Sequence, residues 1–182
     1  MVHNPRLVGA LIFLLTAVGC DRGGNEPVVP LSIQLKSVSF PTGILTKALT
    51  CDGQGASPQL SWSAPPAGTR SLALVVSDLD SPLGYRFVHW VIYNIPTDTR
   101  ELPAGLPMER NLPTGAEQGR NDDDKLGYFP PCPPGNSFHH YDFVLYAVDR
   151  KLNLPAASKK QLLNAISNHV LSKGELIARY RR

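Results

Sequence analysis

Two aspartates separated by one residue make the first candidate site in the sequence. Asp78 and Asp80 stand in the segment Asp-Leu-Asp-Ser-Pro, directly after the apolar run 72–76. In an extended backbone, residues two positions apart point to the same side. Two carboxylates on one side can share a proton, hold a cation or orient a histidine. Aspartate and proline are also frequent in turns, so the alternative interpretation is a plain chain reversal after a strand.

A histidine inside an apolar segment is the second candidate. The segment 87–95 is rich in aromatic and β-branched residues and predicts a strand. Strand alternation places His89 on the same face as Phe87, Val91 and Tyr93. Such a histidine is either a core residue with satisfied hydrogen bonds or an imidazole on the floor of a pocket. In the second case, we expect one of the two aspartates to set its tautomer.

A proline-rich loop followed by two histidines is the third candidate. The stretch 133–141 reads Pro-Pro-Gly-Asn-Ser-Phe-His-His-Tyr. Prolines hold a loop in a defined shape and remove backbone donors. If a strand begins there, His139 shares a face with Tyr141 and Phe143. The alternative interpretation is that the paired histidines are polar surface residues.

Composition narrows the classes of function. The 182 residues include 18 basic and 15 acidic side chains, which gives a formal net charge of +3. No Lys/Arg stripe concentrates this small excess, so we expect no nucleic-acid partner. The 3 cysteines form no CxxC pair, no HExxH is present, and the acidic run 122–124 lacks EF-hand spacing. We therefore expect no metal site and no cofactor.

Strand signals dominate the middle of the chain. Leu31, Ile33 and Leu35 alternate with polar residues, which predicts a half-buried strand. The run 72–76 is apolar without alternation, as in a strand that is covered on both faces. Residues 141–148 predict a further strand, and the proline- and glycine-rich stretches between strands predict turns and long loops.

Helix signals appear near the C-terminus. Ser158 and Gln161 have the spacing of a capping box, and apolar residues then recur at helical spacing on one face. Gly174 is expected to end this helix, and residues 175–180 are expected to form another short helix. Strands followed by helical segments predict a β-sandwich with helical additions, formed by a single domain over residues 31–182.

The first twenty residues have the organisation of an export signal. Arg6 precedes the apolar run 7–18, which is too short to span a bilayer and fits the hydrophobic part of a signal peptide. The run ends in Ala-Val-Gly-Cys, which resembles a bacterial lipobox. Residues 1–19 are therefore expected to be a lipoprotein signal peptide, with Cys20 as the lipidated N-terminus. The alternative is an ordinary secretory signal that is cut near Gly19.

The predicted anchor sets an expected location. Residues 20–30 comprise the lipid-bearing cysteine and a stretch without periodic pattern, and they are expected to form a flexible tether. We expect the mature protein to be bound to a membrane of a bacterial cell envelope and to face the periplasm. Asp21 resembles an inner-membrane retention signal, but the choice between inner and outer membrane stays open.

Several motifs, taken in order, resemble the phosphatidylethanolamine-binding protein family and its bacterial Raf-kinase-inhibitor-like branch. The resemblance covers about residues 31–182. Its main motifs are Thr-Cys-Asp-Gly (50–53), Asp-Leu-Asp-Ser-Pro (78–82), His-Trp (89–90), Gly-Tyr (127–128) and Pro-Pro-Gly followed by His-His-Tyr (133–141). The resemblance implies a mainly β fold, a two-sheet antiparallel β-sandwich with C-terminal helices.

The chain departs from the usual pattern of this family in four places. Leu79 stands where the first motif usually has proline, and residues 121–124 read Asn-Asp-Asp-Asp instead of Asn-Asp-Phe-Gly. Phe-Pro-Pro (129–131) follows Gly-Tyr where Gly-Gly-Pro is usual. His140 replaces an arginine, so a rim arginine is absent at that position. These changes leave the shape of the rim and the choice of ligand open.

The resemblance implies a small anion-binding pocket. By position, its residues are Asp78, Asp80, His89, Pro133 and His139, with Tyr128 as a further rim residue. In this interpretation the imidazoles donate to a phosphate or carboxylate group, and the aspartates hold them in a donating, protonated state. Anion binding is then expected to weaken above roughly pH 7, where histidines lose their protons.

The resemblance also gives two cysteines a role. Cys51 and Cys132 occupy positions where cysteines recur in the bacterial branch, and export favours a disulfide between them. Such a bond would tie the Thr-Cys-Asp-Gly turn to the proline loop, close to the expected pocket. The alternative is a pair of free buried thiols.

These inferences favour a non-enzymatic, membrane-anchored binding or regulatory protein. Its expected partners are a small anionic or phosphorylated ligand and a protein such as a kinase or a protease, because members of the family inhibit enzymes of these classes. One alternative is a hydrolase that uses an aspartate and a histidine as a general base pair. Another is an envelope interaction protein with a vestigial pocket.

Overall fold

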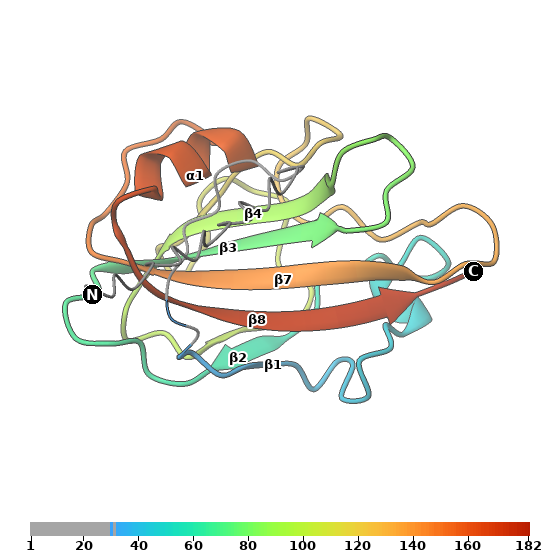
Figure 1. Ribbon diagram of the computed structural model, residues 1–182, viewed down its shortest axis with the longest axis horizontal. Helices are drawn as coiled ribbons and strands as arrows, with labels where there is room; N and C mark the ends of the chain where they lie inside the picture. The colour runs from blue at the N-terminus through green and yellow to red at the C-terminus, as the bar shows by residue number, and fades with distance from the viewer. Residues whose placement is uncertain (1–29, 31) are drawn as a thin grey trace, which may run out of the picture.

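The computed structural model describes Pro30 and residues 32–182 (Figure 1). The predicted signal peptide, the candidate lipidation site Cys20 and most of the predicted tether lie outside the described residues, as does Leu31. Within the part of the chain that the structure describes, no helix is both long enough and apolar enough to cross a membrane.

Two antiparallel sheets form a sandwich, which confirms the predicted fold class. The larger sheet has five strands in the order β6-β4-β3-β7-β8, and the smaller has three in the order β1-β2-β5. The larger sheet consists of β3 (Ser71–Asp78), β4 (Phe87–Ile95), β6 (Glu117–Gln118), β7 (His139–Val148) and β8 (Val170–Tyr180). The smaller consists of β1 (Leu35–Lys36), β2 (Leu60–Trp62) and β5 (Glu101–Leu102). The described helical segments are the 3-10 helix η1 (Lys47–Leu49) and the α-helix α1 (Lys159–Ile166).

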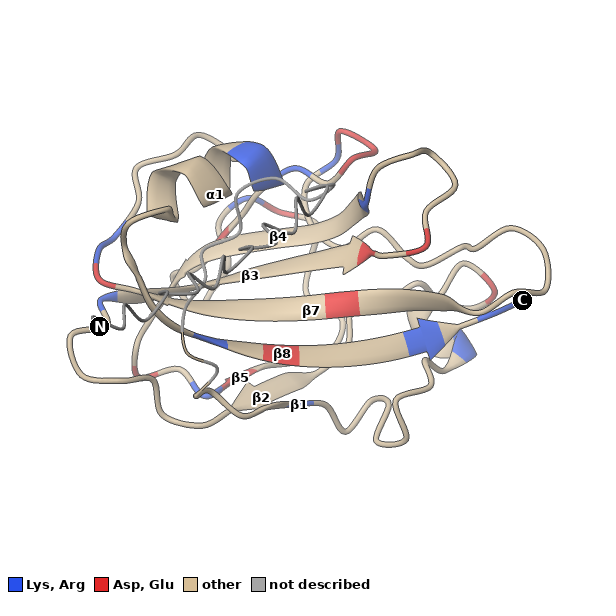
Figure 2. Cartoon of the chain, viewed as in Figure 1, with Lys and Arg blue, Asp and Glu red and all other residues tan. Residues whose placement is uncertain are grey.

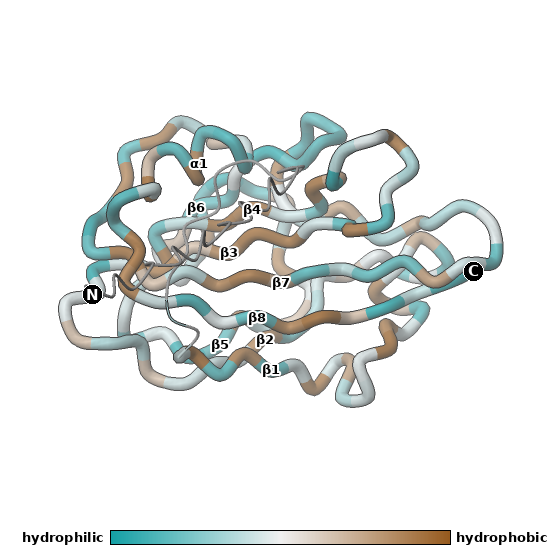
Figure 3. The backbone as a smooth tube through the Cα atoms, viewed as in Figure 1, coloured by the Kyte–Doolittle hydropathy of each residue, from teal (hydrophilic) through white to brown (hydrophobic). Residues whose placement is uncertain are grey.

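The central strand of the larger sheet is buried on both faces, as its continuous apolar sequence predicts. Every residue of β3 is buried. One face of the sheet packs against the smaller sheet, where Val76, Trp90 and Phe143 share a core cluster. The other face packs beneath α1, whose Leu162 and Ile166 are buried. Hydrophobic residues therefore follow β3, β4 and β7 (Figure 3), whereas charged residues are sparse on β3 and β4 and gather in loops and on β8 (Figure 2).

The C-terminal segment corrects one expectation. The predicted capping box of Ser158 and Gln161 is present at the start of α1, but this helix ends at Ile166. Residues 175–180 belong to β8 and form no second helix, so the predicted C-terminal helices reduce to α1. The reason is that β8 pairs along the whole of β7, and its buried side chains alternate with exposed ones.

Gly174 lies inside β8 and does not end a helix. A Cβ atom at this position would lie 2.5 Å from the carbonyl oxygen of Ile33, so the glycine allows close approach of the N-terminal segment to the strand. The other strand expectations hold with shifted ends. The alternation around Ile33 is present but only Leu35–Lys36 pairs as a strand, and β7 begins at His139, earlier than predicted.

Candidate functional site

A β-bulge in β4 determines the direction of the His89 side chain. Val76 of β3 pairs with Trp90, but the next residue, Ser77, pairs with Val88. His89 is therefore the extra residue on β4, opposite the step between these two pairs. Bulges turn the phase of a strand and are frequent next to functional sites.

Because of this bulge, part of the predicted alternation is wrong. Val91 and Tyr93 lie in the core cluster beneath α1, on the opposite face of the sheet from His89. The imidazole of His89 instead contacts Phe87 and Tyr141, with ring centroids 4.9 Å and 5.2 Å away. The predicted shared face holds for Phe87 alone among the three expected neighbours. Strand alternation could not reveal this, because an extra residue shifts every position beyond it.

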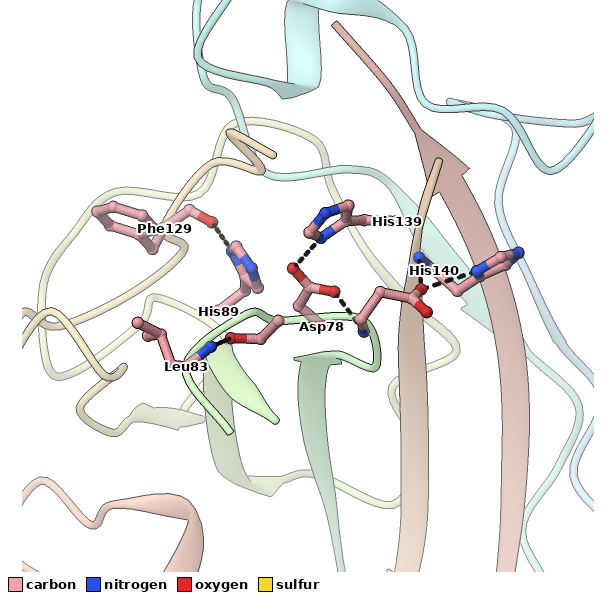
Figure 4. A network of polar contacts seen from close by, with 8 residues as sticks. Asp78, Leu83, His89, Phe129, His139 and His140 are labelled. Carbon is pink, nitrogen blue, oxygen red and sulfur yellow. Dashed lines mark hydrogen bonds and ion pairs between the residues drawn. The ribbon is translucent and has the colours of Figure 1, made fainter. Parts of the chain in front are cut away.

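Asp78 and His139 form a buried pair on neighbouring strands. Asp78 ends β3 and pairs with Tyr141 of β7, so the start of β7 lies beside its carboxylate. Nδ1 of His139 lies 2.8 Å from Oδ2 of Asp78, and both residues are 6% exposed. The other carboxylate oxygen, Oδ1, accepts from the backbone N–H of Asp80 at 2.9 Å. Asp78 thus orients one histidine and also shapes the turn that follows it (Figure 4).

Asp80 contacts the neighbouring histidine, at an exposed position. Its Oδ2 accepts from the backbone N–H of His140 at 2.7 Å and lies 2.8 Å from the Nδ1 atom of the same residue. Partial desolvation raises the pKa of Asp80, but the hydrogen bonds from His140 outweigh it and the net effect lowers this pKa. Both side chains are nearly half exposed, so this pair lies outside the buried part of the site. The sequence motif contained His140, but nothing in its pattern indicated this role.

His89 is held by a backbone carbonyl, and the expectation that an aspartate sets its tautomer is wrong. Its Nδ1 atom lies 2.8 Å from the carbonyl oxygen of Phe129, and the N–H of Phe129 donates to the carbonyl oxygen of His89 at 2.8 Å. A carbonyl oxygen can only accept, so Nδ1 carries the proton and Nε2 of the neutral ring is an acceptor. Phe129 belongs to the Phe-Pro-Pro segment that departs from the usual pattern of the family. This departure was the one feature of the sequence that pointed to a special role for Phe129.

Burial keeps His89 neutral over most of the physiological pH range. Desolvation lowers its pKa from 6.5 to about 4, although the Phe129 carbonyl and the Asp78 carboxylate act to raise it. The expectation of a protonated, donating imidazole at this position is therefore wrong for the free protein near pH 7. His89 presents a hydrogen-bond acceptor to any group that approaches its Nε2 atom.

Tyr141 completes the site with an unpaired donor. Its side chain is fully buried, and its hydroxyl has no hydrogen-bond partner within the described residues. Burial, then the charges of Asp78 and Asp80, raise its pKa, so the phenol keeps its proton. A buried hydroxyl without a partner is uncommon and costs stability unless another molecule satisfies it. The sequence pattern indicated only that Tyr141 shares a strand face with His139.

Two other expected residues are both buried. Tyr128 is in the core rather than at a rim, because its hydroxyl donates to the carbonyl oxygen of Leu49 at 3.0 Å and its ring packs edge-on against Trp90. Pro133 is buried in the loop that precedes β7. It follows Cys132, which forms the predicted disulfide with Cys51.

Arginines reach this end of the sandwich from β8. The guanidinium carbons of Arg179 and Arg181 lie 5.1 Å and 4.6 Å from the ring centroid of Phe138, which immediately precedes β7. Arg179 pairs with His140, the residue that replaces the usual arginine of the family. The pairing of β7 with β8 therefore supplies positive charge beside the position where the sequence lacks it. No group of three or more metal-ligating side chains occurs among the described residues.

Comparisons with known proteins agree with this fold and these motifs. The family model described as phosphatidylethanolamine-binding protein matches residues 36–181. A UPF0098 protein of Methanothermobacter thermautotrophicus is 45% identical over 152 residues, which cover 82% of this chain and 99% of that protein. The crystal structure of YbcL from Escherichia coli matches with a TM-score of 0.75 and 34% identity, over 82% of this chain and 98% of that one.

A crystal structure from Chlamydia trachomatis, described as a homologue of phosphatidylethanolamine-binding protein, matches with a TM-score of 0.75 and 35% identity. It covers 83% of this chain and 98% of its own. The chain therefore belongs to the phosphatidylethanolamine-binding protein family, as its motifs predicted.

Proposed function

We propose that this chain is a non-enzymatic binding protein that captures a phosphoryl or phosphate group at the site of Asp78, His89, His139 and Tyr141. The observation that carries the proposal is the buried hydroxyl of Tyr141, which has no partner within the described residues and whose ring packs edge-on against the imidazole of His89. A bound oxygen atom would satisfy this donor, for which the part of the chain that the structure describes supplies no partner.

The hydrogen-bonding groups of the site suit a partly protonated phosphoryl group. Tyr141 offers a donor, and the neutral His89 offers an acceptor to a P–OH group or takes up its proton. The carboxylate of Asp78, 2.8 Å from Nδ1 of His139, would balance a positive charge on that ring. A phosphoryl group can both accept and donate, whereas a carboxylate anion can only accept. Phosphate, a phosphorylated metabolite and the headgroup of a phospholipid share this chemistry.

Positive charge at the same end of the larger sheet supports an acidic ligand or partner. Arg179 and Arg181 flank Phe138 next to the start of β7, and their charge would attract a phosphorylated molecule or the acidic surface of a protein. We propose a small anionic ligand as the first partner. A kinase or a protease remains a proposal that rests on the family resemblance alone.

Replacement of Tyr141 tests the binding proposal directly. In Tyr141→Phe, we expect the affinity for inorganic phosphate at pH 5 to fall about tenfold, because a donor to a charged ligand is lost. The free energy of unfolding is expected to stay equal or to rise slightly, because the same change removes a buried unpaired hydroxyl. Isothermal titration calorimetry and chemical denaturation measure the two quantities.

Tyr93→Phe is the matched control for this experiment. Its hydroxyl donates to the carbonyl oxygen of Leu154 at 2.8 Å on the opposite face of the sheet. This variant is expected to lose about 1 kcal/mol of stability and to keep its phosphate affinity. Unchanged phosphate affinity in Tyr141→Phe, or weakening of equal size in both variants, would contradict the proposed site.

The hydrolase alternative is tested on the same protein. Incubation with a phosphate monoester and an acyl ester is expected to return both esters intact. Release of product by the wild type that is lost in Asp80→Ala would instead support an enzyme with an aspartate–histidine base pair.

We further propose that Cys20 carries a lipid and anchors the protein to the bacterial envelope, facing the periplasm. The support is the lipobox-like sequence, and the prediction concerns the full-length chain expressed in a bacterium. Cys20→Ser is expected to move most of the protein from the membrane to the soluble fraction, as measured by fractionation. An equal membrane fraction in both proteins would refute the anchor.

A further inference from the structure

We infer that the Cys51–Cys132 disulfide positions the Phe129 carbonyl and thereby fixes the His89 imidazole, so that the site is complete only in the oxidised protein. Cys51, Cys132 and Phe129 are positioning residues that lie outside the binding site itself. This inference rests on the proposed function only where phosphate affinity is the measured quantity.

The proline-rich loop that precedes β7 contacts β4 through Phe129. Phe129 makes two hydrogen bonds to His89, one to the imidazole and one to the backbone, each 2.8 Å long. The ring of Phe129 also lies 5.5 Å from that of Phe87, the neighbour of His89 on the same face. The position of this one loop residue therefore decides which nitrogen of His89 carries the proton.

The loop that contains Phe129 has few backbone N–H groups with which to form hydrogen bonds. Residues 129–134 read Phe-Pro-Pro-Cys-Pro-Pro, so four of these six residues lack a backbone N–H. The N–H of Phe129 is already used by His89. Few backbone hydrogen bonds can hold such a segment, and the covalent bond at Cys132 adds a further anchor.

The disulfide connects the loop to the Thr-Cys-Asp-Gly turn (50–53), which is held by contacts of its own. The N–H of Cys51 donates to the carbonyl oxygen of Pro131 at 3.1 Å. Gly55, with φ of +67°, leaves space for Pro130, whose Cγ would lie 3.0 Å from a Cβ atom at that glycine. The turn is itself tied to the end of β8, because the hydroxyl of Tyr180 donates to Oδ2 of Asp52 at 2.8 Å.

Both cysteines are exposed, so a dithiol reductant can reach the bond. A thiolate of the reductant attacks one cysteine sulfur, which breaks the Cys51–Cys132 bond, releases the other cysteine as a thiolate and forms a mixed disulfide. The second thiolate of the reductant then attacks the reductant's own sulfur in the mixed disulfide and releases the remaining cysteine. Two electrons pass from the dithiol to the protein, and both cysteine thiolates take up protons. The products are a reduced protein with free Cys51 and Cys132 thiols and an oxidised, disulfide-bonded reductant.

Release of the loop would free the imidazole of His89. Without the Phe129 carbonyl, the neutral ring can place its proton on Nε2, and the acceptor that faces the site becomes a donor. A ring with its proton on Nε2 can no longer accept the proton of the P–OH group there, and it also loses its fixed orientation. We expect phosphate affinity to fall about tenfold on reduction, as for the loss of one hydrogen bond to a charged group.

The experiment follows the ring nitrogens of histidine by NMR in the full-length chain. The 5 histidines of the sequence make the spectrum tractable, and His89→Gln assigns the signals of His89. The samples are the oxidised wild type, the wild type reduced with dithiothreitol, and the double variant Cys51→Ser/Cys132→Ser. The control is Leu162→Ala, which weakens the core beneath α1 on the other face of the sheet.

In the oxidised protein, we expect His89 to carry its proton on Nδ1. In the reduced protein and in the double variant, the signals are expected to move toward the Nε2–H tautomer while the fold persists, and Leu162→Ala is expected to keep the oxidised pattern. An unchanged His89 tautomer in both disulfide-free samples would overturn the inference. Phosphate titration of the same samples distinguishes this inference from the proposed function. If the oxidised wild type does not bind phosphate, the proposed function is refuted, whereas the result for the His89 tautomer still stands.

Discussion

The affinity of the protein for sulfate is expected to fall by between about fivefold and about two-hundredfold as the pH rises from 4 to 7. Sulfate keeps its charge over this range, so any change reports a proton taken up by the protein. The pKa of His89 in the free protein is about 4 because the ring is buried. A bound anion next to the ring stabilises its protonated form and raises this pKa by about one to three units.

The direction follows from linkage between proton and anion binding. Between pH 4 and the raised pKa of the complex, each bound sulfate brings one proton to His89, so affinity falls about tenfold for each pH unit. Above the pKa of the complex, His89 contributes no further change. Among the ionisable groups near the ring, Asp78 on β3 favours its protonation and His139 on β7 opposes it. Tyr141 on β7 also contacts the ring, but its raised pKa keeps the phenol protonated over this range. The sequence-based expectation placed the fall above pH 7, and burial of His89 moves it to lower pH.

His89→Gln is the control, because glutamine can still donate to the Phe129 carbonyl but does not titrate. Its sulfate affinity, measured by calorimetry across the same pH range, is expected to lose most of this slope. A wild-type profile as flat as that of His89→Gln would show that anion binding is not linked to this histidine.

The free energy of unfolding is expected to depend on pH through the same residue, by about 3 kcal/mol. The pKa of His89 is about 4 in the folded protein against 6.5 for an ordinary histidine. Between these values the unfolded chain binds a proton that the folded protein does not, so protons favour unfolding. The contribution is fully present above pH 6.5 and is lost progressively as the pH falls toward 4.

Urea denaturation of the wild type and of His89→Gln between pH 4 and 7.5 measures this contribution. Carboxylates such as Asp80 also respond to acid, but they are present in both proteins, so the difference between the two curves isolates His89. We expect that difference to change by about 3 kcal/mol across the range. Parallel curves would mean that His89 titrates alike in the folded and unfolded chains.

A neutral His89 changes the chemistry expected of the site. The sequence suggested two protonated imidazoles that donate to an anion. The structure instead combines an acceptor at His89, an aspartate-oriented His139 and the unpaired hydroxyl of Tyr141. Such a mixed set of donors and acceptors suits a phosphoryl group that carries a proton better than a fully ionised anion.

Much of the fold was predictable because its signals are local. The apolar run in β3, the aromatic segment of β4 and the capping box of α1 all lie within single elements. The pairing of Cys51 with Cys132 was also predicted, from the family resemblance. The strand at 175–180 was missed because its pairing with β7 outweighs the local helical signal, and the bulge at His89 was missed because it depends on the register between two strands.

The sequence by itself determined the family, the sandwich architecture and the motif residues, because each of these depends on residue types at fixed spacing along the chain. Only the tertiary structure decided the partner of each histidine at the site and the neutral state of His89. It also decided that the hydroxyl of Tyr141 has no partner within the described residues and that Arg179 and Arg181 lie over the ring of Phe138. The physical reason is that protonation and hydrogen-bond direction depend on burial and on atoms from other strands and loops. Residues distant in sequence supply those atoms, and their positions are set only when the two sheets and the proline loop come together.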